Sequence, residues 1–126
     1  MSSHDFITPA KMACGLGSAK SGTMHHWSMT VSSVALVILV PLFIFTFGSI
    51  LGSSYEEVTA YYSRPFPAIV AALTILVGFK HFNSGFQTLI EDYVHGPMEK
   101  VLIIGMTCLS YGAAATGLFA IARLAL

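Results

Sequence analysis

Three apolar runs constrain the fold of this chain more than any other feature of its sequence. The runs Val31–Gly52, Phe66–Ile90 and Val101–Ala122 include one lysine, Lys80, and one histidine, His81, and otherwise no charged residue. Each run exceeds the roughly 20 residues that a helix needs to cross about 30 Å of hydrocarbon. An open sheet of strands would leave backbone groups unsatisfied in lipid. We therefore predict an all-α membrane protein with three transmembrane helices, at about residues 31–52, 66–91 and 99–123.

The composition excludes several other classes of protein. Only 10% of the residues are charged, whereas a soluble domain commonly carries about 25%. The formal net charge is zero, so the chain has no basic field to attract nucleic acid. Cys14 and Cys108 stand far apart and form no C-x-x-C pair, which argues against a disulfide framework and against a zinc site.

The N-terminal region predicts the compartment. A polar tail, residues 1–30, precedes a single transmembrane domain at residues 31–126. The apolar stretch of a secretory signal would begin much earlier in the chain. No arginine occurs before Arg64, whereas mitochondrial transit peptides are rich in arginine. These features favour the inner membrane of a bacterium over the mitochondrial inner membrane.

The distribution of basic residues predicts the orientation in the membrane. Lys11, Lys20 and Lys100 fall on one side of the predicted bilayer, and Arg64 and Arg123 fall on the other. Because positive charge is enriched in cytoplasmic segments, we expect the N-terminus to be cytoplasmic. Three helices enclose little space, and the polar groups of the second helix need partners. We therefore expect the chain to be part of a heteromeric helix bundle.

His81 is the first candidate for a functional residue. An ionisable group in the hydrocarbon region costs about 2.5–3.5 kcal/mol or more unless it is paired or faces the protein interior. Three interpretations stay open for it: a neutral imidazole hydrogen-bonded to a neighbouring helix, a metal or haem ligand, and a proton-relay group. Gly85, Thr88 and Asp92 share its helix face. The small Gly85 gives the clearance that a flat macrocycle bound to His81 would need.

Asp92 and Tyr93 are the second candidate site. Asp92 is about 16 Å along the helix axis from His81, which is too far for one small-molecule site. The spacing fits a buried cofactor at His81 and a second ligand near the membrane surface. There Tyr93 could donate a hydrogen bond to a carbonyl, and Asp92 could exchange protons. The plain alternative is a solvated helix end with an interfacial tyrosine.

A motif over His81–His95 links the two sites. It reads H-x-x-x-G-x-Q-x-x-x-x-D-Y-V-H, with Asp92-Tyr93 eleven residues after His81. This motif resembles the signature of the small D-type membrane-anchor subunits of succinate dehydrogenase (complex II). The expected three helices and the length of the chain match these subunits as well.

The resemblance implies cofactors, partners and site residues. The anchor pairs with a second hydrophobic anchor subunit, and each subunit supplies one axial histidine to a shared haem b; here that residue is His81. Ubiquinone binds at a site shared with the iron–sulfur subunit, where Tyr93 bonds a quinone carbonyl and Asp92 supports it or the proton path. His25 or His26 resembles a histidine near the haem propionates. A flavoprotein subunit completes the enzyme, and this chain has no activity alone.

The sequence departs from the family pattern at one place. Many relatives carry an arginine that faces the propionates, but the segment HHWSMTVSSVAL has none. The partner subunit, Lys80 or the paired histidines would then supply the charge. Two other functions stay open: a proton-coupled small transporter subunit that uses His81, Lys80 and Asp92, and the anchor of a fumarate reductase.

Overall fold

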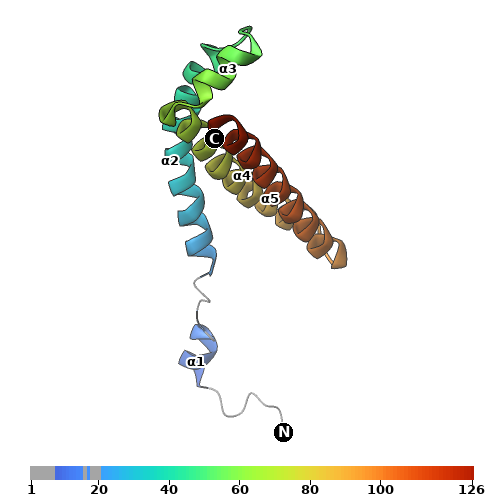
Figure 1. The fold of residues 1–126 in the computed structure, drawn as a ribbon. Coiled ribbons are helices and arrows are strands. Elements are labelled where there is room, and N and C mark those ends of the chain that lie inside the picture. The colour runs from blue at the N-terminus through green and yellow to red at the C-terminus, as the bar shows by residue number, and fades with distance from the viewer. Residues whose placement is uncertain (1–7, 16, 18–20) are drawn as a thin grey trace.

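The computed structural model describes residues 8–15, 17 and 21–126, and this part of the chain is helical without strands. The helices are α1 (Pro9–Cys14), α2 (Ser21–Gly48), α3 (Tyr55–Tyr62), α4 (Pro65–Tyr93) and α5 (Pro97–Ala125) (Figure 1). Within α2, α4 and α5 lie three stretches long and apolar enough to cross a membrane. The prediction of an all-α protein with three transmembrane helices is confirmed.

The start of the first long helix differs from the prediction. The apolar run suggested a start near residue 31, but α2 begins at Ser21. Residues His25, Met29 and Ser32 contact α4, so the additional turns pack against protein and do not trail in solution. Hydropathy marks where a helix enters hydrocarbon, whereas backbone hydrogen bonds continue wherever the side chains permit.

The predicted tail is therefore shorter and partly helical. Within residues 1–30, the structure describes α1 and the first turns of α2, and residues 1–7, 16 and 18–20 lie outside the described part. The side-chain oxygen of Thr8 accepts a hydrogen bond from the backbone of Lys11 at 3.3 Å, and Pro9 follows as the first helical residue. Both features stabilise a helix start, because they satisfy or remove orphan amide groups.

The turns between the long helices have clear local causes. Ser54 caps α3, and Glu57 bonds back to the Ser54 amide at 2.9 Å, which completes a capping box. Pro65 begins α4 and Pro97 begins α5. Gly96 has a φ of 82°, a conformation that favours glycine, and this residue reverses the chain between the two helices.

Helix α4 is central to the packing. It contacts α2 on one side and α5 on another, and α4 and α5 run side by side in opposite directions (Figure 1). Helix α3 packs against both α4 and α5. Most apolar side chains of the spans face outward, since at most 22% of any spanning window is buried. These surfaces are available to lipid or to further helices.

Candidate functional site

His81 is bonded across the interface between α4 and α2. Its Nδ1 atom is 2.9 Å from the Oγ atom of Ser32. Ser32 is buried, and its Oγ atom is also 2.9 Å from the backbone oxygen of Met29. The imidazole itself is half-buried. Because Nδ1 is the nitrogen that faces Ser32, Nε2 is the nitrogen left for another ligand.

A second polar contact lies nearer the membrane surface. The Nε2 atom of His25 on α2 is 3.4 Å from the Oγ1 atom of Thr88 on α4. Thr88 donates to the backbone oxygen of Ser84 at 3.2 Å, and its hydroxyl is 3.9 Å from the sulfur of Met29. We call His25, Met29, Ser32, His81 and Thr88 the polar seam. Sequence reasoning placed His81 and Thr88 on one face, and the structure brings both against α2.

Two glycines leave space along the same face of α4. A Cβ atom added to Gly85 or Gly78 would meet nothing within 4 Å. Gly85 lies four residues after His81 and Gly78 three residues before it, so both flank the imidazole on its helix face. Both positions leave open space on this face of α4, and the role of Gly85 beside a flat group stays a prediction.

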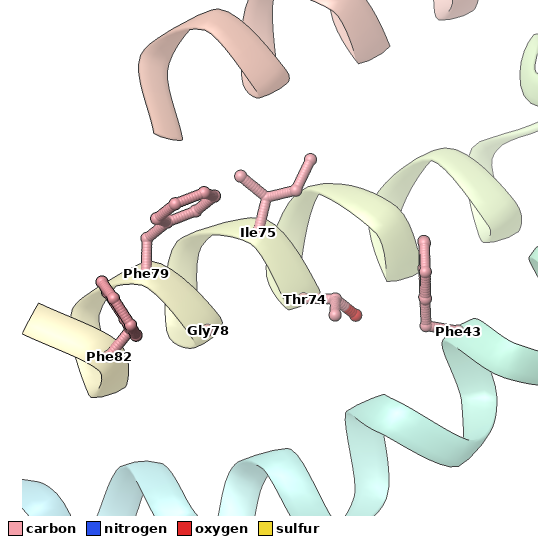
Figure 2. Close-up of a pocket in the computed structure, with 6 residues that line it drawn as sticks. All are labelled: Phe43, Thr74, Ile75, Gly78, Phe79 and Phe82. Atoms are coloured by element: carbon pink, nitrogen blue, oxygen red, sulfur yellow. The ribbon is translucent and has the colours of Figure 1, made fainter. Parts of the chain in front are cut away.

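An apolar groove of about 400 Å³ continues from this face. Figure 2 shows Phe43 on α2 and the remaining lining side chains on α4. The lining residues are Phe43, Thr74, Ile75, Gly78, Phe79 and Phe82. Thr74 donates its hydroxyl to the backbone oxygen of Val70 at 2.7 Å, so its polar atom is satisfied within α4. The groove suits a hydrocarbon group, and it has no side-chain charge to hold a polar substrate.

Lys80 lies beside the first turns of α2. It lines a second groove, of about 570 Å³, together with Trp27, Ser28 and Val31. Lys80 is exposed, and the indole of Trp27 is 67% exposed. Lys80, on α4, therefore faces the first turns of α2 across this groove.

The second candidate site is open in this chain. Asp92 is exposed, and the side chain of Tyr93 is 82% exposed. Helix α4 ends at Tyr93, and the backbone of Val94 closes the last turn on Ile90 at 2.8 Å. The structure does not bring Asp92 into the polar seam, although Asp92 lies on the same face of α4 as His81 and Thr88. This chain supplies one wall of any site at Asp92 and Tyr93.

The two candidate histidines in the first turns of α2 differ from each other. His25 is half-buried and contacts Thr88, whereas His26 is exposed. Only His25 thus belongs to the polar seam. From the sequence the two histidines are equivalent, because adjacent positions do not show which one faces α4.

The donor set of the chain limits the kind of metal group that could bind. Among residues 8–15, 17 and 21–126, no three His, Cys, Asp or Glu side chains gather in a metal-binding arrangement. A lone imidazole suits a metal that arrives with most of its ligands in place. Haem iron is such a metal, because the porphyrin provides four nitrogen ligands and the protein adds only axial ones. The residues present therefore fit haem better than a bare metal ion.

Sequence reasoning missed Ser32 and Met29. Both lie in the segment SMTVSS, where hydroxyl side chains interrupt the apolar character of α2. That cluster was the available signal. It did not reveal which hydroxyl faces His81, since this depends on the register between α2 and α4.

The fold and the site define a multi-pass membrane protein that holds an imidazole at a helix interface inside the bilayer. The chain belongs to the family of succinate dehydrogenase/fumarate reductase transmembrane subunits, whose model matches residues 5–119. The resemblance seen in the His81–His95 motif is thus confirmed. Membership favours the role of a membrane anchor over that of a transporter subunit.

Individual relatives are named as membrane anchor subunits of succinate dehydrogenase. The chain is 46% identical to the succinate dehydrogenase hydrophobic membrane anchor subunit of Paracoccus denitrificans, over 96% of this chain and 94% of the relative. It is 28% identical to the subunit of that name from Rickettsia bellii, over 85% and 86% of the two chains. The succinate dehydrogenase membrane anchor subunit of Reclinomonas americana is 27% identical over 68% and 73%. No solved structure matches this chain significantly.

Proposed function

We propose that this chain anchors a succinate:ubiquinone oxidoreductase in the membrane, binds haem b through His81 and forms part of the ubiquinone-reduction site with Asp92 and Tyr93. The observation that carries the proposal is the half-buried imidazole whose Nδ1 atom is engaged by Ser32. A histidine bonded at one nitrogen and directed with the other is the usual form of a metal ligand. Family membership supports the same assignment.

At the haem site, His81 of this chain would hold the group, and neighbouring residues would form part of its surroundings. A second hydrophobic anchor subunit would supply a further histidine. Gly85 would leave room for the macrocycle, and His25 or His26 would lie near the propionates, with Lys80 as an additional cation. The bound haem supplies one-electron redox chemistry. His81 would hold and orient it, and the helix interface covers one side of the imidazole.

At the quinone site, the residues of this chain bind and exchange protons. Reduction of a quinone to a quinol takes two electrons and two protons. Tyr93 donates a hydrogen bond to a quinone carbonyl, and Asp92 supplies a proton or supports its path. The exposure of Tyr93 fits a site that the iron–sulfur subunit and the second anchor complete. Electrons from succinate arrive through the flavoprotein and iron–sulfur subunits, so this chain alone is inactive.

The proposed orientation places this site on the cytoplasmic side of a bacterial inner membrane. The start of α2 and the end of α4 meet in the polar seam, so they share one membrane face. Lys11 and Lys100 adjoin that face in the sequence, and positive charge favours the cytoplasm. The same assembly could run as a fumarate reductase, since the matched family covers both enzymes.

The test is the Tyr93→Phe variant in the assembled complex. We expect ubiquinone reduction by succinate to fall about 100-fold, as for loss of one hydrogen-bond donor to an oxygen on which negative charge develops. Succinate oxidation by an artificial dye, which needs no quinone site, should be unchanged. Tyr55→Phe is the matched control, because Tyr55 is similarly exposed, at 78%, and belongs to α3. Equal loss of both activities in Tyr93→Phe would indicate faulty assembly, and no loss would remove Tyr93 from the site.

A further inference from the structure

We propose that Ser32 is a positioning residue for His81. It holds the imidazole in the tautomer that is protonated on Nδ1, it fixes the ring orientation, and through that bond it lowers the reduction potential of the haem. The inference rests on the proposed role of His81 as axial ligand. It adds to that role a residue from a different helix, which sets the electronic state of the ligand.

The hydrogen bonds of Ser32 support the tautomer that we propose. A serine hydroxyl has one proton to donate and can also accept. The Ser32 hydroxyl donates to the Met29 backbone oxygen at 2.9 Å. Its lone pairs are then available to accept a hydrogen bond from the Nδ1 atom of His81, which is also 2.9 Å away. A neutral imidazole protonated on Nδ1 carries its lone pair on Nε2, as an iron ligand requires.

The surroundings of Ser32 make this arrangement rigid. Ser32 is 5% exposed, so water has little access to compete for its hydroxyl. Its acceptor, the Met29 oxygen, belongs to the backbone of the same helix and cannot rotate away. A hydroxyl that already donates is a stronger acceptor, because hydrogen bonds in a chain polarise one another. The acceptor oxygen on α2 is thus held in place, and the hydrogen bond to it fixes the orientation of the imidazole on α4.

The bond has a definite consequence for a bound iron. A hydrogen bond from Nδ1–H to an acceptor increases the electron density of the imidazole and raises its basicity as a ligand. A more basic ligand stabilises ferric iron over ferrous iron, so the bond lowers the reduction potential. Loss of the bond should raise the potential and let the ring rotate about its side-chain torsion.

Two isosteric variants isolate the hydroxyl. Ser32→Thr keeps the hydroxyl and Ser32→Val replaces it with a methyl group, so both share the same added bulk. Ser33→Ala is the control for the neighbouring hydroxyl, because Ser33 bonds the same Met29 oxygen at 2.9 Å but is exposed and makes no bond to His81. The purified complex carrying each variant is mixed with excess apomyoglobin, and the rate of haem transfer is measured.

We expect Ser32→Val to lose haem about 10-fold faster than Ser32→Thr, since outer partners of metal ligands contribute roughly 10- to 100-fold in affinity. A redox titration should show a higher midpoint potential for Ser32→Val. The largest g value of the low-spin ferric haem should also shift, because it depends on the orientation of the imidazole planes. Ser32→Thr and Ser33→Ala should match the native complex in all three measurements.

Equal rates, potentials and g values for Ser32→Val and Ser32→Thr would overturn the role of Ser32. If the branched side chains prevent assembly, Ser32→Ala, which adds no bulk, takes the place of Ser32→Val and is compared with the native complex. The His81→Ala complex separates the two proposals. Haem retained with a native spectrum in His81→Ala would overturn His81 as ligand, whereas haem lost there but unaffected in Ser32→Val would overturn Ser32 alone.

Discussion

The two sides of α4 are built in different ways. Toward α2, the contact is made by polar atoms: His81 meets Ser32 at 2.9 Å, and His25 meets Thr88 at 3.4 Å. Toward α5, the contact is made by close packing of apolar and small residues. A Cβ atom added to Gly117 would lie 3.2 Å from the Cδ1 atom of Ile75.

The two interfaces of α4 therefore have different roles: one can orient a cofactor ligand, and the other holds two helices together. In lipid, apolar side chains gain little by leaving their solvent, so helices associate through close packing and hydrogen bonds. The α4–α5 interface is close at Gly117, and α5 also carries the small buried residues Ser110 and Ala114, so we expect it to associate by packing. The α2–α4 interface uses hydrogen-bonding groups of the polar seam, whose geometry can also set a cofactor ligand. We infer that α5 stabilises the position of α4 and that α2 sets the orientation of His81 on α4.

The largest expected effect belongs to the packed side. Gly117→Val would drive two methyl groups into the position of Ile75, and overpacking of this kind costs about 1–3 kcal/mol. The measurement is the free energy of unfolding of the anchor in mixed detergent and SDS. Gly112→Val is the control, because a Cβ at Gly112 meets nothing within 4 Å. An equal loss in both variants would show that close approach at Gly117 is not special.

The next effect belongs to the polar side. A double-mutant cycle of Ser32→Ala and His81→Ala, in the haem-free anchor, should give a coupling energy of about 1 kcal/mol. Hydrogen bonds between transmembrane helices average about 0.6 kcal/mol and reach about 1.7 kcal/mol, and this one is short and partly buried. The same SDS titration measures it. A coupling energy of zero would mean that the two side chains do not interact in the membrane.

A similar cycle on the packed side tests whether polar atoms contribute there as well. The Thr107 hydroxyl donates to the Oδ1 atom of Asn83 at 3.2 Å, across α4 and α5. Thr107→Val combined with Asn83→Leu should give a coupling energy of about 0.6 kcal/mol, close to the average. A value above that for Ser32 and His81 would contradict the contrast between the two sides.

The smallest expected effect on stability at neutral pH comes from Tyr62 in α3, outside both interfaces compared above. Burial raises the pKa of the Tyr62 phenol in α3, and neighbouring Tyr61 raises it further. A raised pKa means that the neutral phenol stabilises the fold at pH values below about 10, the ordinary value of tyrosine. That contribution is lost as the pH rises through the raised pKa.

Alkaline titration tests this expectation. Thermal stability of the native anchor should fall more steeply above pH 10 than that of Tyr62→Phe, which has no phenol to ionise. The two proteins should behave alike at pH 7. Parallel curves above pH 10 would show that Tyr62 does not carry the alkaline sensitivity.

The sequence predicted the existence of the spanning helices better than the residues at which they begin and end. The existence of the three long helices followed from run length alone, and Pro65, Gly96 and Pro97 mark where α4 begins and where α4 is followed by α5. The early start of α2 did not, because residues 21–30 are polar and yet helical. Helix α3 was also missed, although Ser54 and Glu57 form the spacing of a capping box.

The site divides in the same way. The motif identified His81 and the shared face of Thr88, because both follow from spacing on one helix. It could not identify Ser32, since the partner of His81 depends on how far α2 is shifted along α4. That shift is a property of tertiary packing. For the same reason, the roles of Asp92 and Tyr93 stay predictions, because their remaining surroundings belong to other subunits.

The spacing of the two bonds in the polar seam has a consequence for evolution. His25 and Ser32 are seven residues apart, and so are His81 and Thr88, so the two helices carry equal intervals. Sliding α2 by one turn, about 5.4 Å, would separate both pairs at once. Apart from Gly85, residues between the two pairs can therefore change, but an insertion or deletion there would break the match between the two helices. It would also change the depth of the imidazole below the membrane surface. The length of this stretch is thus a constraint of its own, beside the identity of the bonded residues.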